Sequence, residues 1–150
     1  MKKLLLLLPC ILIACKPSSL STTNASTHYL PSPFENVYLD MTTDSILKHR
    51  PAIIRLHSLV ETAYIEYTED LNTDINSTYY YFDPQNSMLK IVKLVYADSE
   101  LLKSFLDQRF NYDDNMRTFT SVSNPNVIAR KELNNLLIQF EKNEINPNNQ

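Results

Sequence analysis

The chain has 150 residues, of which 43% are hydrophobic and 21% are charged, and this is enough sequence for one globular domain with a packed core. Its formal net charge of −3 argues against duplex nucleic acid as a partner, because that affinity comes from cations that neutralise phosphates. The chain contains no glycine, so phosphate-binding P-loops, the dinucleotide-binding fingerprint and the nucleophile elbow are excluded, since each needs glycine at fixed positions.

The first residues are organised like a secretory signal peptide. Lys2 and Lys3 precede an apolar run over residues 4–14. At about 1.5 Å per residue, this run would cross only about half of a ~30 Å hydrocarbon layer, so it is too short for a transmembrane helix. Cleavage would remove both lysines and change the formal net charge from −3 to −5.

The apolar run ends in Leu12, Ile13, Ala14 and Cys15, and this ending resembles the lipobox of bacterial lipoproteins. The resemblance implies that residues 1–14 are a lipoprotein signal peptide, that the Cys15 thiol receives a diacylglyceryl group, and that the new amino terminus is acylated. Several acyl chains together would anchor the protein stably to a membrane. Lys rather than Asp follows the cysteine, which favours the outer membrane, with the protein facing the periplasm.

Composition divides the rest of the chain into three parts. Residues 15–33 are rich in Pro, Ser, Thr and Asn, and such a stretch buries too little apolar surface to offset its ordering entropy, so we expect a lipidated flexible tether. Residues 34–142 should form the folded domain, and residues 143–150 a disordered tail. Loss of Cys10 with the signal peptide leaves Cys15 as the single cysteine, which excludes disulfides and cysteine-ligated zinc.

The first half of the domain has signals for one short helix and three strands. Residues 40–51 combine hydroxyl residues that can cap a helix, an early acid, late cations and Pro51 as a stop. Alternation predicts a strand over residues 62–68. Aromatic and β-branched residues predict strands over residues 78–83 and 88–97, joined as a hairpin.

The second half is predicted to contain a helix over residues 99–109, with an apolar face formed by Leu101, Leu102, Phe105, Leu106 and Phe110. Strands are predicted over residues 116–122, 127–133 and 136–140, although residues 129–141 also have the composition of a single amphipathic helix. Asparagine-rich loops are expected to supply the left-handed conformations that glycine would otherwise take. The predicted fold class is α+β, with an antiparallel sheet, a short N-terminal helix, and the helix at 99–109 packed on one face.

This order of elements resembles the small envelope lipoproteins of the SmpA/OmlA, or BamE-like, type. Their domains open with a Gly-Met-Thr/Ser segment and a short helix that ends in Gly-x-Pro, and here Asp40-Met41-Thr42 and His49-Arg50-Pro51 match that frame. Both glycines are replaced, by Asp40 and by His49. The resemblance covers about half the chain and implies an α+β layout and a role in outer-membrane protein assembly.

Few residues are spaced for catalysis or metal binding. The three histidines form no zinc signature, and His57 and Ser58 are adjacent, so their side chains diverge on a helix or a strand. The acidic residues at the expected turns do not have the spacing of a calcium loop. We therefore predict no catalytic residues, no metal site, no cofactor and no enzymatic activity.

Tyrosine is the residue type that points to a function. Of the nine tyrosines, Tyr79, Tyr80 and Tyr81 are consecutive, and in a strand Tyr80 points opposite to its two neighbours. Tyrosine combines a large contact area with a polar tip and is enriched at protein interfaces. These three residues are the candidate binding surface, and the alternative is that their rings pack within the sheet.

The sequence therefore predicts a lipid-anchored binding or scaffolding module of the bacterial envelope, accessory to outer-membrane assembly or maintenance, whose partners are the membrane and another envelope protein. A second hypothesis is a periplasmic immunity or inhibitor lipoprotein, whose acidic surface would complement a basic toxin or enzyme. A third hypothesis, from another class, is a hydrolase that acts on envelope substrates.

Overall fold

The computed structural model of the chain describes residues 28–56 and 63–140. The predicted signal peptide, Cys15, most of the tether, the tail and the His57–Ser58 pair lie outside these ranges. The elements within them are α1 (Thr43–His49), β1 (Ile54–Arg55), β2 (Ile65–Asp70), β3 (Ile75–Phe82), β4 (Leu89–Tyr96), α2 (Ser99–Arg109), β5 (Phe110–Asp113), β6 (Thr118–Ser121), β7 (Val127–Glu132) and β8 (Asn135–Phe140).

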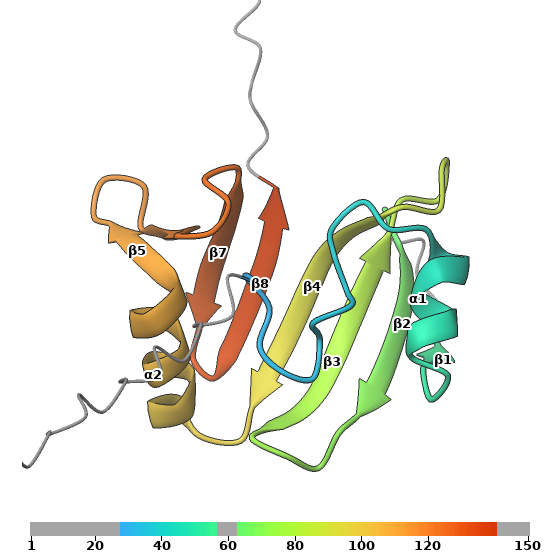
Figure 1. Cartoon of the computed structure of the whole chain (residues 1–150), viewed down its shortest axis with the longest axis horizontal. Helices are drawn as coiled ribbons and strands as arrows, with labels where there is room; N and C mark the ends of the chain where they lie inside the picture. Colours follow the sequence, from blue (N-terminus) through green and yellow to red (C-terminus); the bar gives the residue numbers. More distant parts are fainter. Residues whose placement is uncertain (1–27, 57–62, 141–150) are drawn as a thin grey trace, which may run out of the picture.

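The strands form one antiparallel sheet with the order β1-β2-β3-β4-β8-β7-β6-β5 (Figure 1). Each half of the sheet is a four-stranded meander preceded by a helix, so α1 with β1–β4 and α2 with β5–β8 repeat the same topology. The two meanders meet where β4 pairs with β8, from Ile91 opposite Gln139 to Val95 opposite Asn135. No repeat is visible in the sequence, so only the three-dimensional structure reveals this one.

The predicted α+β fold, with the helix at 99–109 packed on one face, is wrong, because the fold is dominated by its sheet. The eight-stranded sheet dominates, with 43% of the described residues in strands and 17% in helices. Helix α2 contacts β4, in the middle of the sheet, and β5, at its edge. Two short edge strands, β1 and β5, were missed because edge strands need little hydrophobic alternation, and β5 follows α2 without a loop.

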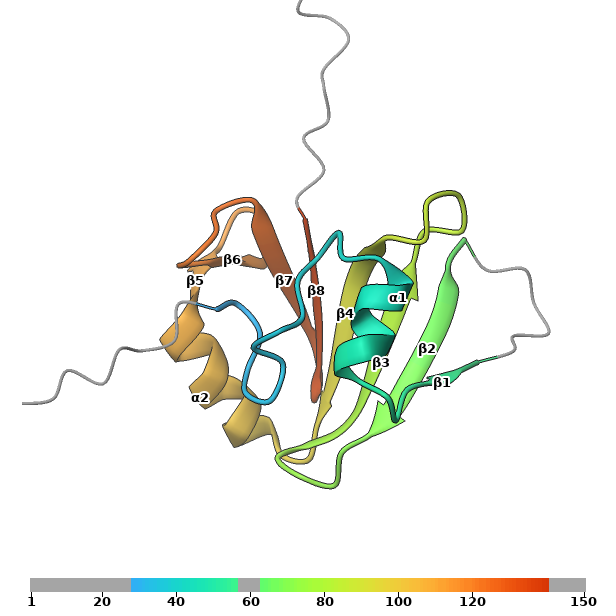
Figure 2. The same cartoon turned by 45° about the vertical axis from the view of Figure 1, so that its right-hand side comes forward.

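The N-terminal segment, residues 28–42, covers more of the sheet than either helix does. It runs across one face of the sheet between α1 and α2, and all three lie on the same side in both views (Figures 1 and 2). The tether was expected to extend to residue 33, yet Tyr29 and Leu30 are already buried in the core. The folded unit therefore begins before Phe34, because this apolar pair has a sheet to pack against.

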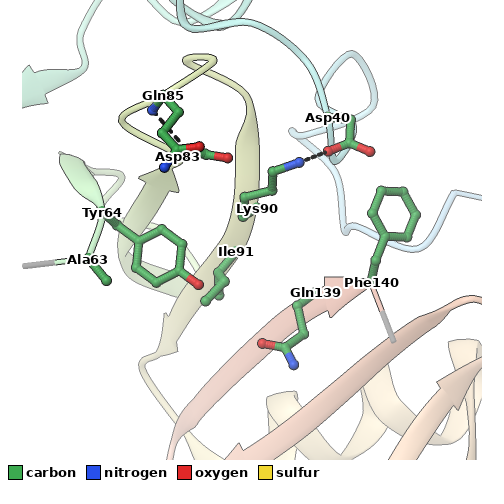
Figure 3. A pocket seen from close by; sticks show the side chains of 9 residues that line it. All are labelled: Asp40, Ala63, Tyr64, Asp83, Gln85, Lys90, Ile91, Gln139 and Phe140. Carbon is green, nitrogen blue, oxygen red and sulfur yellow. Dashed lines mark hydrogen bonds and ion pairs between the residues drawn. The ribbon is translucent and has the colours of Figure 1, made fainter. Parts of the chain in front are cut away.

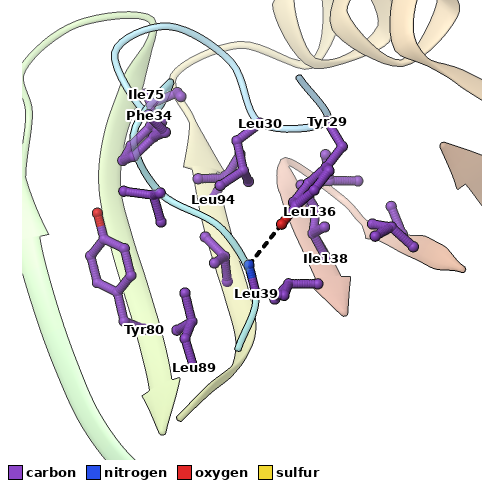
Figure 4. Close-up of a cluster of buried hydrophobic side chains, with 14 of the residues drawn as sticks. Tyr29, Leu30, Phe34, Leu39, Ile75, Tyr80, Leu89, Leu94, Leu136 and Ile138 are labelled. Atoms are coloured by element: carbon purple, nitrogen blue, oxygen red, sulfur yellow. Dashed lines mark hydrogen bonds between the residues drawn. The ribbon is translucent and has the colours of Figure 1, made fainter. Parts of the chain in front are cut away.

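The core lies between this segment and the sheet, on what we call the inner face. Leu30, Phe34 and Leu39 from the segment pack against the inward side chains of β3, β4 and β8 (Figure 4). The Tyr29 hydroxyl accepts a hydrogen bond of 2.7 Å from the Leu39 backbone N–H, so the segment is also tied to itself. Ile46 of α1 is fully buried against the same cluster.

Helix α2 has the bounds that the sequence predicts, but a narrower buried face. The Asp98 side chain caps it by accepting from the Glu100 backbone N–H at 2.7 Å. Within the helix, Leu102 and Leu106 are buried, whereas Phe105 is only half-buried, with its ring near those of Tyr96 and Phe110. Leu101, which was also predicted to face the core, is 39% exposed.

Residues 129–141 resolve, as far as residue 140, into the hairpin of β7 and β8, not a helix. Leu133 occupies the turn with a φ of 55°, a left-handed conformation that is unfavourable for a branched side chain. The positive-φ residues of the described chain are Asp40, Asn72, Ser87, Arg117 and Leu133. The expectation that asparagine would take these positions is therefore wrong except at Asn72.

Candidate functional site

The sheet face opposite the core carries the candidate site. Its side chains alternate with the buried ones along β3, β4 and β8, and we call this set the outer face: Tyr79, Tyr81, Ile91, Lys93, Val95, Leu137 and Gln139. Neither helix nor the N-terminal segment lies on this side (Figures 1 and 2). All seven residues are half-buried, because they shield one another within the sheet.

The outer face has two cross-strand rows. In one row Tyr79 lies opposite Lys93, which lies opposite Leu137. The Lys93 ammonium lies 5.4 Å from the centre of the Tyr79 ring, within the range of a cation–π contact. This first row therefore places an aromatic ring, a cation and an aliphatic side chain next to one another across three strands.

In the second row Tyr81 lies opposite Ile91, which lies opposite Gln139. The Tyr64 ring meets that of Tyr81 edge-on, with the ring centres 6.2 Å apart. Burial, followed by the negative charge of Glu66, raises the pKa of the Tyr81 hydroxyl. This hydroxyl therefore stays protonated at neutral pH and can donate as well as accept hydrogen bonds.

The three predicted tyrosines separate onto two faces. Tyr79 and Tyr81 lie on the outer face, as a binding surface requires. Tyr80 lies on the inner face and is 0% exposed, so its inclusion in the candidate surface is wrong. The expected alternation is confirmed, and the core on the inner face decides which ring is hidden.

Tyr80 instead belongs to a buried polar network. Its hydroxyl donates to Glu69 Oε1 at 2.6 Å, and Arg50 donates to the same oxygen from Nε at 2.9 Å and from Nη2 at 2.6 Å. Arg50 also donates from Nη1 to the Pro33 carbonyl at 3.1 Å, and its guanidinium lies 4.8 Å from the centre of the Phe34 ring. This network holds the N-terminal segment and the end of α1 to β2 and β3.

A cavity of about 450 Å³ adjoins the outer face at the end of β4 (Figure 3). Ile91 and Gln139 belong to both the second row and the cavity wall, and Tyr64, whose ring contacts Tyr81, also lines the cavity. The nine described residues that line it are Asp40, Ala63, Tyr64, Asp83, Gln85, Lys90, Ile91, Gln139 and Phe140. No sequence pattern indicates the cavity, because these residues come from five separate stretches of the chain and no regular spacing connects them.

The charged groups of the cavity wall already have structural partners. Lys90 Nζ pairs with Asp40 Oδ1 at 2.6 Å, and Asp83 Oδ1 accepts from the Gln85 backbone N–H at 2.8 Å within a turn. Asp40 therefore holds the Lys90 side chain at the rim of the cavity, and Asp83 stabilises the backbone of the turn. With Ile91 and Phe140 as apolar walls, the arrangement resembles a pocket for a partner side chain, apolar at its centre and polar at its rim.

Acidic residues that the sequence places at turns, and that are not predicted to bind calcium, have structural partners as well. Glu69 is part of the buried network, and Asp113 Oδ1 accepts from the backbone N–H groups of Asn115 and Met116 in the β5–β6 turn. In residues 28–56 and 63–140, no group of three or more His, Cys, Asp or Glu is placed to hold a metal ion.

Two further observations concern the whole molecule. No helix in the described part of the chain is long and apolar enough to cross a membrane. Comparison with known proteins gives no match to a family model, to a curated protein or to a solved structure. Function is therefore inferred from the outer face, its cavity and the chemistry of the residues that form them.

Proposed function

We propose that this protein is a lipid-anchored, non-enzymatic binding module of the bacterial envelope, which holds another envelope protein on the outer face of its sheet. One observation carries the proposal: within residues 28–56 and 63–140, the N-terminal segment covers one side of the sheet and leaves the other side uncovered. The uncovered side presents two tyrosines and three aliphatic residues beside a cavity of about 450 Å³.

The chemistry of the outer face suits a protein partner. Tyr79 and Tyr81 are half-buried, and their rings already contact Lys93 and Tyr64, so they lose less conformational entropy on binding than free side chains would. A partner side chain that enters the adjoining cavity would be surrounded by Tyr64 and Ile91 and would meet polar groups at the rim. Interfaces concentrate their binding energy in a few anchors of this kind.

The envelope location rests on the lipobox and on the resemblance to BamE-like lipoproteins. Asp40 stands where that family has glycine, and its φ of 63° is a conformation that glycine favours. This supports the match to the family frame, and with it an accessory role in outer-membrane assembly or maintenance. At His49, the second replaced glycine, φ is not positive, so that position adds no support.

Site-specific photo-cross-linking tests the proposal. A photoreactive phenylalanine analogue at position 81 should cross-link an outer-membrane assembly or maintenance component in intact cells, and Tyr79→Ala should reduce the yield several-fold. The matched control places the analogue at Tyr112, which is 55% exposed on β5 at the far edge of the sheet. Equal cross-linking from both positions would refute the outer face as the binding surface. A single soluble basic toxin or enzyme cross-linked at position 81 would instead identify an immunity or inhibitor lipoprotein.

Anchoring has its own test. Cys15→Ala should abolish metabolic labelling with a fatty-acid probe and leave the precursor uncleaved, because only the thiol can form the thioether. Equal labelling of the wild type and the variant would contradict lipidation at Cys15 without bearing on the outer face.

A further inference from the structure

A second cavity, of about 400 Å³, lies on the other side of the sheet, between the N-terminal segment, the β2–β3 turn and α2. We propose that this cavity binds a small primary amine, with the hydrocarbon chain against its apolar wall and the ammonium beside Asp74. The site is distinct from the outer face and does not depend on the function proposed above.

The apolar wall includes residues from two parts of the chain. Pro31 and Pro33 line the cavity from the N-terminal segment, and Leu101 and Phe105 line it from α2. Leu101 is 39% exposed, although it lies on the helix side predicted to face the core, so it is available to cover a hydrocarbon chain. A volume of about 400 Å³ is at the small end of the range for small-molecule sites, ~300–1,000 Å³.

The charge of the cavity selects for a cation. Asp74 is the one charged residue among the described residues that line it. Within the described chain, the Asp74 carboxylate has no ion pair and no side-chain hydrogen bond. Phe105 and Tyr96 both line the cavity, and aromatic rings are favourable neighbours for a cation.

Tyr96 supplies an independent observation. It lines the cavity, it is 4% exposed, and its buried hydroxyl has no hydrogen-bond partner among residues 28–56 and 63–140. Such unpaired buried groups are rare in folded proteins, because each one loses its hydration without compensation. Burial, followed by the charge of Asp74, raises the pKa of the Tyr96 hydroxyl, so it stays neutral and its oxygen can accept from an ammonium N–H.

The ligand class follows from these groups together. A primary ammonium has three N–H donors, which match a free carboxylate and an unpaired hydroxyl oxygen. A short alkyl chain matches the proline, leucine and phenylalanine side chains. An anion would be repelled by Asp74, and a neutral alcohol of the same length would keep the apolar contact but lose the ion pair.

Methyl NMR of the full-length protein in detergent tests the proposal with three probes at neutral pH: n-butylammonium, n-butanol and butyrate. We expect saturable shifts at Leu101 and Ile75 with butylammonium, binding of butanol about 5-fold weaker, and no shift with butyrate. Asp74→Asn should reduce the affinity for butylammonium by about 5-fold, the upper range for an exposed charge pair, whereas Asp114→Asn, an acidic control outside the cavity, should leave it unchanged.

Filling the cavity provides a second variant, because Ser104 lines it from the exposed side of α2. Ser104→Trp should abolish the shift at Ile75 while the shifts of distant core methyl groups keep their native positions. Equal binding of butanol and butylammonium, an unchanged affinity in Asp74→Asn, or no saturable shift with any probe would each overturn the proposal. Tighter binding of Nα-acetyl-lysine amide than of butylammonium would overturn the small amine as the ligand and would instead identify a lysine side chain of a protein.

Discussion

Replacing Glu69 with leucine tests how the buried polar network stabilises the fold. The side chain of Glu69 is 3% exposed and that of Arg50 is 14% exposed, so neither group can recover its hydration when the other is lost. Leucine has a similar volume, so the variant removes the carboxylate without opening a large cavity. It leaves the Arg50 guanidinium and the Tyr80 hydroxyl without their shared acceptor.

The size of the effect follows from the contacts. Three donors lie 2.6–2.9 Å from a single carboxylate oxygen, and each charge-assisted bond contributes about 1.5–3 kcal/mol net. Because they share one acceptor, their contributions are not additive, and removal of one partner from a buried ion pair typically costs about 3–5 kcal/mol. This is a large part of the ~5–15 kcal/mol stability of an ordinary domain.

Urea unfolding followed by circular dichroism measures the loss. With a slope of about 1.5 kcal/mol per molar urea, Glu69→Leu should lower the midpoint by about 2–3 M. The triple variant Arg50→Met, Glu69→Leu, Tyr80→Phe should recover most of this loss, because it leaves no buried polar group unpaired.

The surface pair Lys103–Asp107 is the matched control. It has the same 2.6 Å separation as the shortest Arg50–Glu69 contact, but both of its side chains are 62% exposed. Lys103→Ala should therefore leave the urea midpoint unchanged within error. A Glu69→Leu midpoint within 0.5 M of the wild type (about 0.75 kcal/mol at that slope), or a triple variant as unstable as the single one, would refute this account of the network.

Three further predictions concern the packing, a turn and pH. Leu106→Ala should cost about 2–5 kcal/mol and lower the melting temperature more than Phe105→Ala does, because Leu106 is buried and Phe105 is half-buried. An equal loss in the two variants would contradict the assignment of Leu106 to the buried face of α2. Leu133→Asn should raise stability by about 0.5–1 kcal/mol in thermal unfolding, because Leu133 is 87% exposed and has a left-handed φ of 55°; a loss of stability would contradict this. Burial lowers the pKa of the His28 imidazole below its ordinary value of 6.5. The unfolded chain therefore binds the proton more readily than the folded protein does. The stability contributed by neutral His28 is complete above pH 6.5 and is lost as the pH falls through the folded pKa. The urea midpoint should therefore fall less between pH 7 and pH 5.5 in His28→Gln than in the wild type, and parallel curves would contradict the assignment.

Local chemistry in the sequence was sufficient for the elements that depend on neighbours along the chain. The Asp98 cap and the apolar spacing place the helix at 99–109, where the structure has α2. The β-forming runs place β3 and β4, and the turn at residues 83–88 pairs them. These features depend on contacts within a few residues, which is the range that a single sequence reports directly.

The predicted binding surface includes Tyr79 and Tyr81, which lie on the outer face, but is wrong for Tyr80, because the local pattern of the strand was its only basis. A period of two residues shows that Tyr80 points opposite to Tyr79 and Tyr81, but it does not show which side is the core. That choice depends on Glu69 and Arg50, which are 11 and 30 residues away from Tyr80 and provide a buried partner for its hydroxyl. The tertiary structure therefore decided which tyrosines remain on the outer face.

Sheet order and the role of the N-terminal segment also depended on the tertiary structure. The two meanders join through β4 and β8, whose paired residues are 40 to 48 positions apart in the sequence, and no local signal encodes that pairing. Tyr29 and Leu30 look like part of a polar tether in the sequence, because their immediate neighbours bury almost nothing. They belong to the core because the sheet provides an apolar surface for them, and burial on that surface offsets the entropy lost in ordering the segment.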